Sequence, residues 1–144
     1  MRAQEYLRQI RKLDRIIQNK MIEQAQWRLM ATGTTSRMTE DKIQTSKNYQ
    51  KMADAMDRYI DLEREIDATI DKLVDVKNEI LHTIERLDVV EYDMLHKIYV
   101  QYLTLYDVAD DYDKSYSWAT TIHGIALKNV QKILDERNGD VTPR

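Results

Sequence analysis

One apolar repeat limits what this chain can fold into more than any other feature. Between Met52 and Leu87, apolar side chains recur at alternating steps of four and three residues through five heptads. A strict repeat of this kind is typical of a helix that presents one continuous side to a partner helix. The sequence therefore predicts a long helix in a coiled coil or hairpin. The repeat positions are Met52, Met56, Tyr59, Glu63, Ile66, Ile70, Leu73, Lys77, Ile80, Ile84 and Leu87, with Leu62 and Val76 beside the two polar ones.

The scarcity of turn residues extends the helical prediction to the whole chain. Only three Gly and one Pro occur in 144 residues, and helix-forming residues dominate. We therefore expect an all-α fold. A first helix is predicted from Arg2 to Ala31, where Tyr6, Ile10, Leu13 and Ile17 share one side and Lys20 or Met21 continues it.

The predicted helices divide the chain into three parts. Residues 1–88 are expected to form a coiled-coil hairpin or an oligomerisation stalk, with a loop at about 32–47, where hydroxyl and β-branched residues gather. Residues 89–137 would be a helix-turn-helix domain and residues 138–144 a flexible tail. A homo-oligomer, preferably a dimer, is expected through the apolar repeat. The residues assigned to it are Ile66, Ile70, Leu73, Ile80, Ile84 and Leu87.

Residues 105–134 have the spacing of a helix-turn-helix. A short helix over 105–112 would bury Val108, Ala109 and Tyr112, and Ala109 must be small because the next helix crosses its backbone. Ser115 is a typical N-cap for that second helix, because its hydroxyl can accept from an unpaired backbone N–H. The core face expected for the second helix is Ala119, Ile122, Ala126, Leu127 and Val130.

A recognisable pattern runs through this segment: Val-Ala-x-x-Tyr from residue 108, Ser-Tyr-Ser-Trp from 115, and Ile-His-Gly-x-Ala-Leu-Lys-x-Val from 122. From Met94 to Leu134 it resembles region 4 of bacterial sigma factors. It is more closely similar to region-4-like phage regulators, the late-gene activators of the RinA and ArpU type. Residues 42–54, followed by the heptads, are also similar to short phage proteins of this kind.

The resemblance implies a DNA-binding regulator of phage late or packaging genes. The expected partners are double-stranded DNA and the host RNA polymerase, in the bacterial cytoplasm. Asp113 departs from the pattern, because many such turns have Gly there. Ser117, Thr121 and Ile125 stand where relatives would have Arg, so one copy should bind weakly and two copies better. The resemblance places Tyr116, Ser117, Thr120, Thr121 and Gly124 at the bases, with Lys114 and Lys128 near phosphates.

The charge pattern leaves two roles open for the basic residues at the start. Residues 1–45 carry nine Lys or Arg against five Asp or Glu, whereas residues 46–88 carry seven against eleven. The basic side chains from Arg8 to Arg15 are expected to face the acidic second helix, or otherwise to contact phosphate. The acidic set Asp107, Asp110 and Asp111 suits a protein partner more than DNA.

Other chemistry finds little support in the residues. There is no Cys, no Gly-rich phosphate loop and no run long enough for a membrane helix. Glu79-x-x-His82 and Asp93-x-x-His96 have a spacing found in di-iron bundles, but the facing carboxylates that such a site needs are not evident. We therefore expect no enzyme, no metal, no cofactor and no membrane partner. The alternative to a regulator is a helical structural or interaction protein, such as a phage assembly or DNA-packaging factor.

Overall fold

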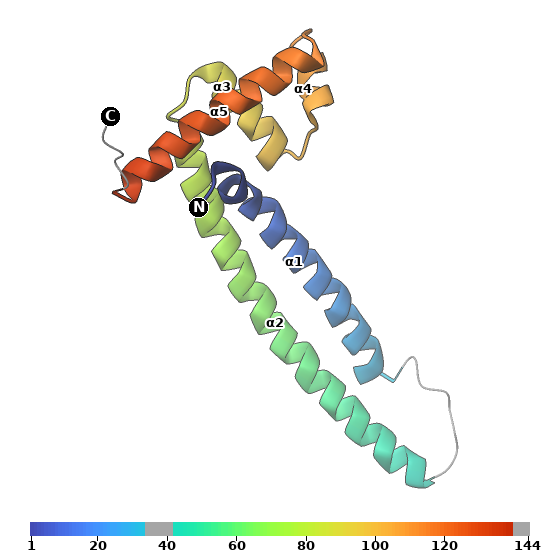
Figure 1. The fold of residues 1–144 in the computed structure, drawn as a ribbon. Coiled ribbons are helices and arrows are strands. Elements are labelled where there is room, and N and C mark those ends of the chain that lie inside the picture. Colours follow the sequence, from blue (N-terminus) through green and yellow to red (C-terminus); the bar gives the residue numbers. More distant parts are fainter. Residues whose placement is uncertain (34–41, 140–144) are drawn as a thin grey trace. The chain divides into compact units, whose positions relative to one another are not determined.

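The computed structural model describes residues 1–33 and 42–139, without the side chains of residues 42–46 (Figure 1). Every element in that part of the chain is helical, so the expected all-α class is confirmed. Within it no helix is both long and apolar enough to span a bilayer. The elements are α1 (Ala3–Ala31), α2 (Lys42–Ile84), α3 (Val89–Leu95), the π-helical turn η1 (His96–Val100), α4 (Leu105–Asp111) and α5 (Tyr116–Arg137).

The chain forms two compact units, which are described separately. Unit 1 contains residues 1–12 and 73–144, and unit 2 contains residues 13–72. The boundary that the sequence predicts at residue 88 lies between α2 and α3. Unit 1 instead joins both ends of the chain, because the start of α1 and the end of α2 contribute to one core with α5.

The second helix begins earlier than the sequence predicts. Residues 42–47, expected in the loop at about 32–47, are the first residues of α2. Hydroxyl and β-branched residues lower helix propensity by only tenths of a kcal/mol, and a long packed helix outweighs that. Thr32 and Gly33 form a turn after α1, in which Gly33 has φ 71°. Residues 34–41 and the tail residues 140–144 lie outside the described part.

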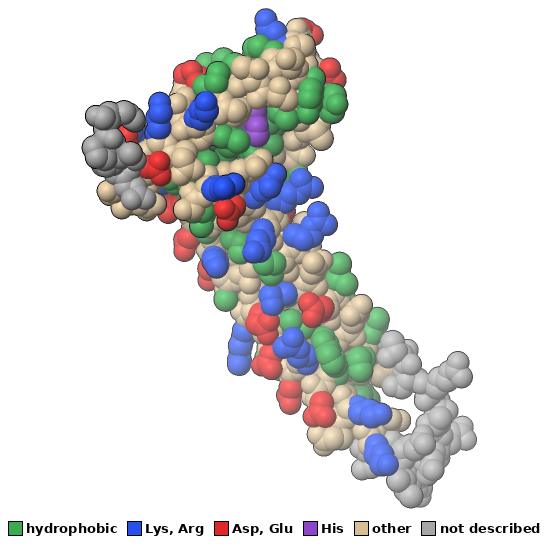
Figure 2. All heavy atoms as spheres, viewed as in Figure 1, with side chains coloured by type: hydrophobic (Ala, Val, Ile, Leu, Met, Phe, Trp, Pro, Cys, Tyr) green, Lys and Arg blue, Asp and Glu red, His purple; other side chains and the backbone are tan. Residues whose placement is uncertain are grey.

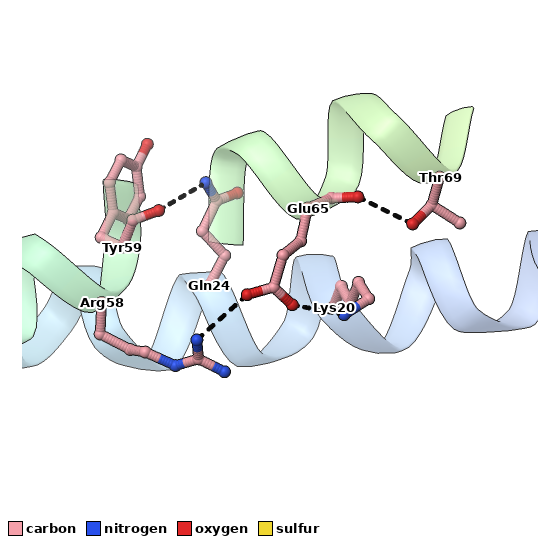
Figure 3. Close-up of polar contacts among 6 residues, drawn as sticks. All are labelled: Lys20, Gln24, Arg58, Tyr59, Glu65 and Thr69. Atoms are coloured by element: carbon pink, nitrogen blue, oxygen red, sulfur yellow. Dashed lines mark hydrogen bonds and ion pairs between the residues drawn. The ribbon is translucent and has the colours of Figure 1, made fainter. Parts of the chain in front are cut away.

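In unit 2, α1 and α2 lie side by side in opposite directions. Lys20 Nζ is 2.7 Å from Glu65 Oε1, and Gln24 donates to the carbonyl of Tyr59 at 3.4 Å and to the carboxylate of Glu63. Glu65 also accepts from Arg58 of its own helix at 3.2 Å (Figure 3). The hydrogen bond from Lys20 is the main cause that lowers the pKa of Glu65. Of the two alternatives for the apolar side of α1, Lys20 is therefore the residue that faces α2.

In unit 2, at two positions of the predicted apolar repeat the side chain is exposed, and the residue before each of them is buried instead. Leu62 is completely buried, whereas Glu63 is exposed. In the same way Ala55 is buried and Met56 is 42% exposed. Both sets have a spacing near 3.5 residues, but a helix can bury only the set that faces its neighbour. The predicted repeat is therefore wrong where it places Met56 and Glu63 on the packed side.

The core of unit 1 gathers around the apolar face of α5. Ala126, Val130 and Leu134 of this helix are buried against side chains from the start of α1, the end of α2, α3 and η1. Asp88 is the N-cap of α3. Its carboxylate accepts a hydrogen bond of 3.1 Å from the N–H of Glu91. The other members of this core are Ala3, Tyr6, Leu7, Ile10, Ile80, Ile84, Leu95 and Tyr99.

The packed side of α2 can be tested with two neighbouring substitutions. Leu62→Ala should lower the free energy of unfolding by about 2–5 kcal/mol, because it leaves a cavity at a fully buried site. Glu63→Ala should change it by less than about 1 kcal/mol, because only an exposed hydrogen bond is lost. Urea unfolding at fixed protein concentration measures both. A larger loss for Glu63→Ala would contradict the packing described here.

Candidate functional site

The helix α4 is fixed at its start by a capping box. The hydroxyl of Thr104 accepts from the N–H of Asp107 at 3.1 Å, and the carboxylate of Asp107 accepts from the N–H of Thr104 at 2.9 Å. These bonds hold the pKa of Asp107 below its usual range. A second carboxylate of this helix, Asp111, lies 3.6 Å from Lys97. Two of the three acidic residues suggested for a protein partner thus have contacts within the chain, and Asp110 is exposed.

The turn after α4 has a well-defined geometry. The N–H of Asp113 donates to the carbonyl of Asp110 at 3.1 Å, and the N–H of Lys114 donates to that of Ala109 at 2.9 Å. These two bonds make a Schellman motif, whose central residue is left-handed. Asp113 occupies that place with φ 53°. The turn therefore needs the left-handed conformation for which many such turns have Gly, and Asp adopts it here.

The helix α5 begins and packs as the sequence predicts. Ser115 accepts from the N–H of Trp118 at 3.0 Å, which confirms it as the N-cap. Ala119 is completely buried against Val108, Ala109 and Met94, so two small residues bring α4 and α5 close together. Ala126 and Val130 are also fully buried. The remaining expected core residues, Tyr112, Ile122 and Leu127, are partly buried beside these clusters.

Aromatic side chains pack against one another at the start of α5. The ring of Tyr116 stacks on that of Tyr106 of α4, with centroids 4.2 Å apart. Trp118 turns inward against Tyr112, at 5.3 Å between ring centroids. Tyr112 in turn donates a hydrogen bond to Asp93, and burial followed by this carboxylate raises the pKa of Tyr112 to about 12. These contacts fix the entry to α5 and leave its polar side open.

The residues predicted to face DNA lie together on this open side. Ser117, Thr121 and Gly124 are exposed, and Thr120 is half-buried. The hydroxyls of Thr120 and Thr121 donate to the carbonyl of Ser117 at 2.8 and 3.0 Å, which leaves their oxygens able to accept. The two flanking cations, Lys114 before α5 and Lys128 within it, are exposed.

No close contact among the described residues requires glycine at position 124. It lies in the middle of α5, and a Cβ placed there would meet no described atom within 4 Å. Glycine in a helix interior costs about 0.5–1 kcal/mol relative to alanine. A helix that carries this cost on an exposed side has room there for the close approach of another molecule.

On the packed side of α5, a series of hydrogen bonds links α1 through η1 to α5. The amide of Gln4 donates to the hydroxyl of Tyr99 at 3.4 Å, and Tyr99 shares a hydrogen bond of 2.8 Å with Nε2 of His123. Burial, and then the positive charge of Arg8, lowers the pKa of His123. His123 is therefore a half-buried packing residue that bonds a side chain of η1. Sequence reasoning missed Tyr99 because its contacts join distant segments.

The residues assigned to oligomerisation lie mostly inside the chain's own core. Ile80 and Ile84 are completely buried in unit 1, where Leu73 and Leu87 pack against the same cluster. Ile66 is 5% exposed, whereas Ile70 is 40% exposed. Ile70 is therefore the most exposed of the six, and Leu73 and Leu87 are partly exposed. Ile66, Ile80 and Ile84 are buried within the chain's own packing, and oligomerisation through the repeat stays a prediction.

The described residues contain no group of three His, Asp or Glu side chains placed to hold a metal ion. Asp93 and His96, which have the spacing of a metal pair, contact Tyr112 and Gln101 instead. Comparison with family models, with curated proteins and with solved structures found no match.

The buried histidine should make stability depend on pH. Because the folded chain lowers the pKa of His123 below its ordinary value near 6.5, the unfolded state binds this proton more readily. The free energy of unfolding should therefore fall as the pH drops below about 6.5, and His123→Gln should remove that part of the slope. Urea unfolding from pH 8 to 5.5 measures it. Glu91, whose raised pKa acts in the opposite direction, is present in both proteins. Equal slopes for both would contradict the assignment.

Proposed function

We propose that this chain is a phage-type, DNA-binding transcriptional regulator in which α4, the turn at Asp113 and α5 act as a helix-turn-helix. The observation that carries the proposal is the polar, exposed side of α5 with Gly124 at its middle. In a helix-turn-helix the second helix enters the major groove and its first turns reach the base edges. A glycine on that side allows the helix backbone to approach the DNA closely.

Each residue of this side has a role in the proposal. Tyr116, Ser117, Thr120 and Thr121 face the bases. The hydroxyl oxygens of Thr120 and Thr121 accept from base amino groups, and the hydroxyls of Tyr116 and Ser117 can also donate to base nitrogens and carbonyls. Lys114 and Lys128 flank them and contact phosphates, which position the helix without reading sequence. The role in activating late or packaging genes follows from the resemblance to sigma region 4. The exposed Asp110 on α4 is suited to contact with host RNA polymerase.

Gly124 gives the sharpest test, because its two effects have opposite signs. Gly124→Ala should raise the free energy of unfolding by about 0.5–1 kcal/mol, since alanine favours the helix and meets no neighbour. The same change should weaken binding to duplex DNA at least about tenfold, because the added methyl group lies between the helix and the base edges. Thermal unfolding and fluorescence anisotropy measure the two effects.

A matched control is Asn78→Ala, on an exposed position of α2 in the same unit. It should stabilise the helix and leave DNA affinity unchanged. Replacing Thr120 and Thr121 together with Ala should reduce sequence preference without loss of folding. Unchanged binding by Gly124→Ala and by the double threonine variant would show that α5 does not face DNA.

We also propose that two copies of the chain act together. In unit 2, Met56 and Ile60 of α2 are each 42% exposed, and on α1 Met21 and Ile22 are 55% and 58% exposed. Exposed apolar side chains favour association with a surface of the same kind. Two copies would recover the affinity that a recognition helix without Arg lacks.

Association should depend on these apolar side chains. Met56→Glu combined with Ile60→Glu should convert a dimer to a monomer, because it places two charges in the contact. Sedimentation equilibrium over a hundredfold range of concentration measures the mass. Lys72→Glu, at an exposed position of the same helix about three turns after Ile60, serves as the control. A parent protein that remains monomeric throughout would contradict the proposed dimer.

The second candidate function is a helical structural or interaction protein, such as an assembly or DNA-packaging factor. The same exposed apolar residues of unit 2 favour it, since they suit a protein partner of any kind. This candidate predicts that the parent chain has no affinity for duplex DNA at low salt while it remains folded and associated.

A further inference from the structure

The N-terminal part of α1 carries a group of exposed cations without acidic partners. The first twelve residues contain four Lys or Arg and one Glu. Arg8, Arg11 and Lys12 share one side of the helix, at spacings of three and four residues, and all three are exposed. None of the ion pairs formed among residues 1–33 and 47–139 involves them. The sequence left two roles open for these cations. In the described part of the chain they form no ion pair with the acidic second helix.

These cations lie beside the open side of α5. The N–H of Ala3 donates to Gln131 of α5 at 2.8 Å, and the charge of Arg8 acts on His123. Gln4, one turn before Arg8 on α1, bonds Tyr99, and Tyr99 bonds His123, the residue before Gly124. This part of α1 therefore lies next to α5, at the edge of the side proposed to face DNA. Figure 2 shows Lys and Arg side chains gathered beside a histidine on this face of unit 1.

Arg11 is held in place by an unusual piece of backbone. Its guanidinium lies 5.1 Å from the centre of the Tyr102 ring, a cation–π contact. Tyr102 has φ 64°, a left-handed backbone conformation that bulky residues rarely adopt. The preceding π-helical turn imposes this conformation, as the N–H of Leu103 donates to the carbonyl of Lys97 at 2.9 Å and that of Gln101 to His96 at 3.0 Å. π-Helical turns and strained residues of this kind occur often at functional sites.

We propose that Arg8 and Arg11 of α1 bind backbone phosphates of the DNA duplex whose groove α5 enters, so that the first helix is part of the DNA-binding surface. A guanidinium stacked on a ring keeps its N–H edge free, and this edge matches the oxygens of a phosphate. The proposal rests on the proposed function of α5. It also explains how DNA could be bound by a chain whose net charge is −3, because the cations missing from α5 are supplied by α1.

The test compares salt dependence, which counts phosphate contacts. The double variant Arg8→Gln with Arg11→Gln should weaken binding of the full chain to any duplex by roughly 10- to 30-fold near 0.15 M salt. The slope of log affinity against log salt should fall by about 2. Arg8→Lys with Arg11→Lys should keep most of the affinity, because the charges remain. The control is Arg28→Gln with Arg64→Gln, an equal loss of charge at exposed positions of unit 2.

The outcomes separate this inference from the proposed function. If the parent binds DNA and the Arg8 and Arg11 variant matches the control in affinity and slope, the inference is overturned while the role of α5 stands. If the variant lowers the slope on all sequences and the threonine variant changes only sequence preference, both are supported. A folded parent that binds no duplex at low salt overturns both.

Discussion

Burial of the apolar face of α5 is the constraint on which the rest of unit 1 depends. Ala126, Val130 and Leu134 must be covered, and no single neighbouring helix covers them all. The start of α1, the end of α2, α3 and η1 do so together, which brings both ends of the chain into one core. Because one face of α5 is buried in this way, the opposite face is exposed to solvent. The exposed face carries the polar residues and Gly124.

The same packing explains why polar residues occur at the edge of the core. Tyr6 and Thr83 share a hydrogen bond of 2.8 Å inside unit 1, and Tyr99 links Gln4 to His123 in the same way. A buried polar group must find a partner or lose free energy, so these contacts fix α1 against its neighbours in one orientation. Through them the basic side of α1 has a defined place next to α5.

Local signals in the sequence were sufficient for α5 and insufficient for contacts between distant segments. Ser115 as N-cap and the buried Ala119 follow from residue type and spacing, and the resemblance drew attention to the turn at Asp113. The choice between Leu62 and Glu63 does not, because both fit the repeat and only the position of α1 decides it. The π-helical turn and the left-handed Tyr102 gave no signal, since both conformations run against the preference of their residues.

The proposed function requires that unit 1 binds duplex DNA. The most direct measurement is the affinity of the full-length protein for random-sequence and phage-promoter duplexes over a series of salt concentrations. The account predicts saturable binding that prefers some sequences and weakens steeply as salt rises. A protein that is folded and binds neither duplex at low salt would contradict it, and the open side of α5 would then have to be explained by a protein partner.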